Sequence, residues 1–210
     1  MIHHKKQFIF LHAPRCAGKS VELAIWNQEP AWHSADHRLP SEYITTYGRE
    51  TWDSYFKFAF ARNPWDRMVS RYRVLIQRGN RITEDFNDWL KNTPQMLINV
   101  VPQYHWFYYQ DQPIDFIGKI ENIESDWNYI VKRLALVELF PENYITSKPT
   151  RIPLKLPYVN LTKTAGKQKK RFHYTKYYNE ESIEIVRERY KLDIEAFGYQ
   201  FGNRKILRYA

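Results

Sequence analysis

The stretch IFLHAPRCAGKSVE, residues 9–22, decides the fold of this chain. An apolar run leads into Pro14, and a basic residue and small residues then lead into Gly18, Lys19 and Ser20. This order predicts a strand, a phosphate-binding loop and the start of a helix, because backbone N–H groups at a helix N-terminus attract anions. The rest of the sequence indicates which phosphate compound the loop holds.

The loop matches the Walker A motif of P-loop enzymes only in part. That motif, G-x-x-x-x-G-K-[ST], surrounds phosphates with backbone N–H groups and places a lysine on them and a hydroxyl on magnesium. Gly18, Lys19 and Ser20 fit it, but Ala13 stands where the first glycine is needed. A kinase or NTPase that uses Mg-ATP is therefore an alternative, with Asp115 as its candidate magnesium-binding acid.

Two further segments repeat the order of strand and helix. Residues 55–61 are predicted as a strand, and Asn63 and Pro64 begin a helix whose apolar residues follow a 3.6-residue period. Residues 114–121 predict another strand, with Asn122 capping the helix after it. Three such units imply an α/β fold with a mostly parallel central sheet flanked by helices.

The remaining segments carry weaker patterns. Residues 79–110 are expected to be helical and to cover the sheet edge as a lid or acceptor wall. The loop 160–171 is strongly basic, and it either closes over a nucleotide, steers an acidic acceptor or is a solvated run of charge. A final helix is predicted from Asn179 to Gly198, where glycine ends it.

Composition limits the classes of function. A chain of 210 residues suits a single domain, residues 1–210, and the net charge of +9 favours anionic partners. The charge and the aromatic residues of 104–109 also fit a nucleic-acid-binding module, but that interpretation leaves the loop motifs unexplained, so no nucleic-acid partner is expected. The single cysteine, Cys16, excludes an internal disulfide. With no leader or membrane span in the sequence, a cytoplasmic protein is expected.

A second basic motif lies in FAFARNPWDRMVSRY, residues 58–72. Arg62 lies at the C-terminal end of the predicted strand 55–61. Ser70 follows in the second turn of the next helix, away from the apolar stripe of that helix. Both side chains can reach one phosphate group. The alternative is that Arg62 pairs with an acid such as Asp66 and that Ser70 faces solvent.

Together, HAPRCAGKS and FAFARNPWDRMVSRY resemble the two nucleotide-binding segments of sulfotransferases, specifically the carbohydrate, family 2-like type. The usual forms there are H-x-P-K-T-A-G-T-S and F-x-x-V-R-N-P-[WY]-D-R-L-V-S. IDFIGKIENIESDW, YVNLTKT and YKLDIEAFGYQF resemble further parts, so nearly the whole chain is covered. The resemblance implies a fold related to P-loop kinases. It also implies sulfuryl transfer from 3′-phosphoadenosine 5′-phosphosulfate (PAPS) to a hydroxyl of a carbohydrate or similar small acceptor, with no metal.

The resemblance also implies roles for individual residues. Arg62 and Ser70 would bind the 3′-phosphate of the nucleotide. The 5′-phosphosulfate would be bound by Arg15, Cys16, Ala17, Gly18, Lys19 and Ser20. Arg15 replaces the lysine that is usual in the family, and Lys19 replaces a threonine. Stabilisation of the leaving group is therefore assigned jointly to Arg15 and Lys19, and an inactive nucleotide-binding relative is an alternative.

An attacking hydroxyl needs a base, and histidine has a suitable pKa. In related sequences a histidine lies about fifteen residues before the tryptophan of W-x-x-Y-F-K-F, and His37 stands in that relation to Trp52. His37 is therefore the predicted base, whereas His12 is expected to be structural. Other candidates in this region are His33, the runner-up, and the carboxylates of Asp36 and Glu42.

Overall fold

The computed structural model describes residues 1–26, 36–77, 85–94, 100–136 and 172–202. Its central sheet has four strands in the order β1-β2-β3-β6. They are β1 (Ile2–His3), β2 (Phe8–Phe10), β3 (Phe56–Ala61) and β6 (Phe116–Lys119). β2, β3 and β6 are parallel, and β1 pairs antiparallel with β2. The predicted α/β class with a mostly parallel sheet is confirmed.

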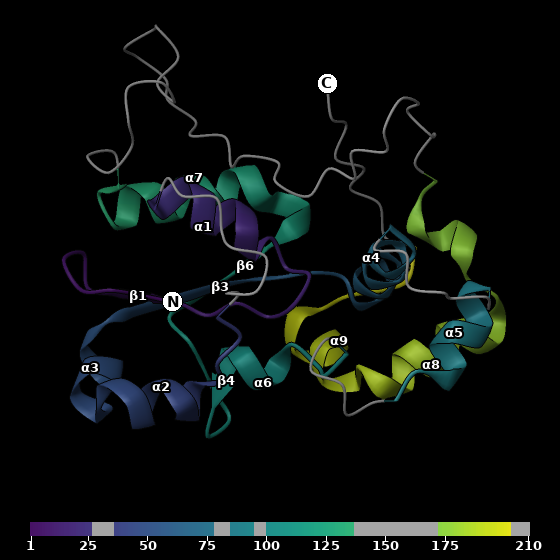
Figure 1. The fold of residues 1–210 in the computed structure, drawn as a ribbon, viewed down its shortest axis with the longest axis horizontal. Coiled ribbons are helices and arrows are strands. Elements are labelled where there is room, and N and C mark those ends of the chain that lie inside the picture. Colours follow the sequence, from purple (N-terminus) through teal and green to yellow (C-terminus); the bar gives the residue numbers. More distant parts are fainter. Residues whose placement is uncertain (27–35, 78–84, 95–99, 137–171, 203–210) are drawn as a thin grey trace, which may run out of the picture.

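One face of the sheet is covered by α1 (Gly18–Trp26) and α7 (Ile123–Arg133), which lie together above it in Figure 1. Successive side chains of a strand point to opposite faces, so alternate residues of β2 and β3 face these helices. They are aromatic: Phe8, Phe10, Phe58 and Phe60. All four are buried, and they form a core with Trp127 and Ile130 of α7.

The other face of the sheet carries a larger core, formed with helices from the middle and end of the chain. Ile9, Ala59 and Ala61 point to this side, where Trp65 and Trp106 are among the largest buried side chains. The helices are α2 (Pro40–Tyr47), α3 (Arg49–Ser54), α4 (Pro64–Gln77), α5 (Phe86–Asn92), α6 (Tyr104–Phe107), α8 (Glu180–Arg189) and α9 (Lys191–Phe197). The sheet is therefore flanked by helices on both faces.

Parallel strands bring the two predicted binding segments to one edge of the sheet. β2 and β3 are neighbours, with Ile9 opposite Lys57 and Phe10 opposite Phe58. The loop after β2 leads into α1, and the turn after β3 leads into α4. Both connections leave from the carboxyl ends of the strands, which is the edge where open α/β sheets bind ligands.

The segment 79–110, predicted to be helical, is helical in only part of its described residues. Within its described residues, α5 and α6 are short helices, and β4 (Tyr108–Tyr109) then forms a hairpin with β5 (Gln112–Pro113). Trp106 and Phe107 are buried, so this part of the segment contributes to the core. Tertiary packing explains the difference, because Trp106 and Phe107 are part of the buried core.

Other boundaries differ in detail. A 3-10 turn over Ile120–Asn122 separates β6 from α7, so the strand ends earlier than predicted. The final helix is two helices, α8 and α9, which meet at Tyr190, and Gly198 ends α9 with a left-handed φ of 65°. The basic loop 160–171 lies outside the described residues. In the parts of the chain that are described, no helix combines the length and apolarity needed to cross a membrane.

Candidate anion-binding site

The loop between β2 and α1 has an unusual backbone. Arg15 and Ala17 have positive φ angles of 70° and 59°, although neither residue is glycine. Left-handed conformations cost roughly 1–2 kcal/mol for such residues, and they cluster at ligand-binding sites. Turns of this kind direct backbone N–H groups into an anion-binding concavity. The loop therefore has a backbone conformation that can bind an anion.

Gly18 begins α1, and a close approach by His12 explains why it is glycine. A Cβ atom at this position would lie 1.9 Å from Cε1 and Nε2 of the His12 imidazole. His12 is buried, and this burial holds its pKa well below the usual value. The neutral ring therefore packs against Gly18, and His12 has a structural role.

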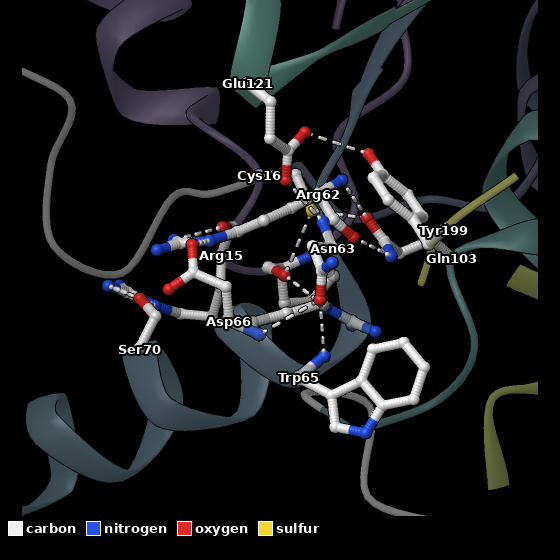
Figure 2. Close-up of polar contacts among 12 residues, drawn as sticks. Arg15, Cys16, Arg62, Asn63, Trp65, Asp66, Ser70, Gln103, Glu121 and Tyr199 are labelled. Atoms are coloured by element: carbon white, nitrogen blue, oxygen red, sulfur yellow. Dashed lines mark hydrogen bonds and ion pairs between the residues drawn. The ribbon is translucent and has the colours of Figure 1, made fainter. Parts of the chain in front are cut away.

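Two guanidinium groups lie together beside this loop, and Figure 2 shows them on the same side as Ser70. Arg15 donates from Nη2 and Nε to Ser70 Oγ, at 2.8 and 3.2 Å. Arg62 donates from Nη1 to the carbonyl oxygen of Arg15, at 3.1 Å. The two basic motifs therefore meet, although 55 residues separate Arg15 from Ser70.

The environments of Arg62 and Ser70 correct part of the sequence interpretation. Arg62 Nε donates to Asp66 Oδ2 at 2.8 Å, so the predicted pairing with an acid is present. Ser70 is only 8% exposed, and its hydroxyl contacts Arg15, so the alternative in which it faces solvent is wrong. Arg15, assigned above to the 5′ group, thus touches the serine assigned to the 3′-phosphate.

Two buried residues that hold this arrangement were not singled out from the sequence. Arg67 of α4 is fully buried and donates to the carbonyl oxygens of Pro14 and Val101, at 2.9 and 2.8 Å. Gln103 is also fully buried, and its side chain contacts Cys16 and the backbone of Arg62. Arg67 lies within the second basic motif, but no sequence pattern indicates its partners.

The turn after β3 is fixed by a second set of contacts, visible in Figure 2. Asn63 caps α4 as predicted, since its Oδ1 accepts from Trp65 N at 3.1 Å. Its own N–H donates to Glu121 Oε1 at 2.8 Å, and Glu121 Oε2 accepts from Tyr199 OH at 3.1 Å. Residues near the end of β6 and after α9 thereby hold the chain next to Arg62.

The predicted base, His37, is anchored in a defined tautomer. His37 Nδ1 lies 2.7 Å from the carbonyl oxygen of His12, which only accepts, so Nδ1 carries the proton and Nε2 is the acceptor of the neutral ring. Trp106 Nε1 donates to the carbonyl oxygen of His37 at 2.8 Å. Burial lowers the pKa of His37, which favours the neutral ring near pH 7.

The alternative bases have other contacts. Asp36 Oδ2 accepts from Tyr43 OH at 2.8 Å, and Asp36 Oδ1 lies 3.3 Å from Arg38 Nε. Glu42 Oε2 accepts from the backbone N–H of Leu39 at the start of α2, at 2.6 Å. His33 lies outside the described residues. Both carboxylates are therefore used in local structure.

The family follows from a comparison with known proteins. The profile of the Sulfotransferase family matches residues 1–200, almost the entire chain. The chain belongs to the sulfotransferase family. Members of this family generally use PAPS as the sulfate donor, and membership supports sulfuryl-group transfer as the activity.

Two relatives of this chain are informative. An uncharacterised protein of Archaeoglobus fulgidus is 33% identical over 92 residues, which cover 43% of this chain and 77% of the relative. Carbohydrate sulfotransferase 14 of Danio rerio is 26% identical over 199 aligned residues, covering 71% of this chain. The match spans about half of that enzyme, 52% of its length. No solved structure matches the chain.

Asp115 is not placed for the magnesium-binding role that a kinase would require. It precedes β6, so it lies at the opposite edge of the parallel sheet from the loop after β2. Its carboxylate pairs with Lys57 Nζ at 2.9 Å and accepts from Lys57 N at 2.7 Å. Among the described residues, no group of three His, Cys, Asp or Glu side chains has the geometry of a metal site.

Proposed function

We propose that this sulfotransferase transfers a sulfuryl group from PAPS to a hydroxyl of a carbohydrate or a similar small acceptor. The observation that carries the proposal is the convergence of Arg15, Arg62 and Ser70 beside a loop with two left-handed residues. PAPS bears a 5′-phosphosulfate and a 3′-phosphate, so it requires more than one anion-binding group. The carbohydrate acceptor is supported by the name of the Danio rerio relative.

In this proposal the two segments divide the nucleotide between them. The loop residues 15–20 bind the 5′-phosphosulfate through backbone N–H groups and the side chains of Arg15 and Lys19. Arg62 and Ser70 bind the 3′-phosphate. Asp66 orients the Arg62 guanidinium through the bond to its Nε, and the planar fork of arginine is suited to a phosphate oxygen pair.

The reaction is an in-line displacement at sulfur. The acceptor oxygen forms a bond to sulfur, the bond from sulfur to the bridging phosphate oxygen breaks, and the hydroxyl proton passes to His37 Nε2. Arg15 and Lys19 stabilise the negative charge on the leaving phosphate, so the scheme requires no metal. Anchoring of His37 Nδ1 on the His12 carbonyl supports the assignment of Nε2 as the base.

Ligand-induced stabilisation tests the proposal without knowledge of the acceptor. We expect 3′-phosphoadenosine 5′-phosphate (PAP) to raise the melting temperature without magnesium and more strongly than AMP. A ligand at a hundredfold excess over its Kd adds roughly 2.7 kcal/mol of stability. A shift with Mg-ATP alone would refute the proposal in favour of a kinase. Binding without transfer of labelled sulfate to a panel of carbohydrates would favour an inactive relative.

A double variant locates the binding site. Arg62→Ala with Ser70→Ala should abolish the shift caused by PAP, because both groups assigned to the 3′-phosphate are removed. The matched control is Arg49→Ala, which removes an exposed arginine that pairs with Asp53 at the same i,i+4 spacing. The control should retain the full shift. An unchanged shift in the double variant would show that the nucleotide binds elsewhere.

A further inference from the structure

Gln103 lies at the centre of the contacts that join the two basic motifs, as Figure 2 shows. It directly precedes α6 and is fully buried. Its Oε1 accepts from Cys16 Sγ at 2.9 Å and from Arg62 N at 2.8 Å. Its Nε2 donates to the carbonyl oxygen of Arg62 at 2.8 Å. The amide therefore binds both backbone polar groups of Arg62 and, at the same time, the phosphate loop.

The orientation of the Gln103 amide is fixed from behind by Asp193 of α9. Asp193 is fully buried, and its Oδ2 accepts from Gln103 Nε2 and from Gln103 N, both at 3.0 Å. Asp193 Oδ1 also accepts from Tyr104 N, at 2.8 Å. Because a carboxylate attracts the NH₂ end of an amide, the oxygen of Gln103 is turned toward Cys16.

The contact with Cys16 requires a protonated thiol. Burial raises the pKa of Cys16 to about 11, so the thiol keeps its proton near pH 7 and donates to Gln103 Oε1. Cys16 lies between Arg15 and Ala17, the two residues with positive φ. The bond therefore holds the middle of the strained loop.

We propose that Gln103 is a positioning residue that fixes the spacing between the loop 15–20 and Arg62. One nucleotide can then be bound at its 5′ group and at its 3′-phosphate at the same time. This inference rests on the proposed function. The loop and Arg62 follow different strands, and a side chain that binds both limits their relative movement. A ligand with two phosphate groups depends on that spacing, whereas a ligand with one phosphate does not.

The test compares three ligands with Gln103→Met, which preserves side-chain length and removes the amide. The ligands are PAP, adenosine 5′-phosphate and adenosine 3′-phosphate, and calorimetry gives each Kd. We expect the affinity for PAP to fall by about tenfold or more, because its two phosphate groups can no longer be bound at a fixed spacing. The affinities for the two monophosphates should fall much less, because each has a single phosphate group. Equal losses for all three ligands would overturn the inference and leave Gln103 a merely structural residue.

Two further variants keep the test decisive. Gln112→Met makes the same chemical change at an exposed position in the hairpin, and it should bind all three ligands like the wild type. Cys16→Ala removes the loop's contact with Gln103, together with a longer contact from Sγ to the carbonyl oxygen of Pro14 at 3.6 Å, and it should again weaken PAP binding more than monophosphate binding. If Gln103→Met does not fold, the affinities of Cys16→Ala for the three ligands test the inference instead. A wild-type protein that does not bind PAP would instead refute the proposed function, and the inference with it.

Discussion

Replacing Gly18 with alanine tests whether the loop needs glycine because of His12. The new Cβ would lie 1.9 Å from the imidazole, where ordinary contact begins near 3.4 Å, so the ring must retreat by about 1.5 Å. His12 is only 5% exposed, and its ring lies 4.5 Å from that of His37 and 5.9 Å from that of Phe10. A retreating ring would therefore strain the buried residues around it.

The expected cost follows from this overlap. Overpacking a buried site costs about 1–3 kcal/mol, and we expect Gly18→Ala to lower the free energy of unfolding by about 3 kcal/mol. Helix propensity predicts the opposite sign, because alanine is favoured over glycine in a helix by about 1 kcal/mol. The sign of the change in the free energy of unfolding therefore distinguishes overlap with His12 from helix propensity. Affinity for PAP should fall as well, since Gly18 belongs to the loop.

Urea denaturation of a double-mutant cycle provides the measurement. Gly18→Ala is compared in the wild-type background and in a His12→Ala background, where the ring is removed. We expect most of the cost to disappear in the second background, because the added methyl then has space. An equal cost in both backgrounds, or a Gly18→Ala variant as stable as the wild type, would refute the reasoning.

Two other predictions concern the base and the buried arginine. Burial holds the pKa of His37 below its usual 6.5, and a protonated His37 cannot accept the hydroxyl proton. We therefore expect kcat/KM to decline toward acid pH with a midpoint below 6.5. A midpoint above 6.5 in the pH profile, or normal turnover by His37→Ala, would contradict the assignment. Arg67→Met leaves the carbonyl oxygens of Pro14 and Val101 without their donor and should lower the free energy of unfolding by about 1–3 kcal/mol. Urea denaturation measures this loss, and wild-type stability together with wild-type PAP binding would show that Arg67 does not hold the loop.

The strand and helix units were predictable because their signals are local. The apolar run 55–61 and the pair Asn63 and Pro64 lie within a few residues of the boundary that they set, and β3 and α4 form there. The described part of the segment 79–110 is helical only at Phe86–Asn92 and Tyr104–Phe107, and the difference from the predicted helical segment has a tertiary reason. Trp106 is buried in the core, and local patterns do not distinguish a buried aromatic residue from one that faces a ligand.

The sequence by itself determined the family and the two segments that carry the basic groups, because both are encoded in short motifs with characteristic spacing. Only the tertiary structure decided how these groups meet. The contact of Arg15 with Ser70, the approach of His12 to Gly18 and the bridge made by Gln103 join different elements. They arise because neighbouring parallel strands end at one edge and buried polar groups there must find partners, which a motif does not record.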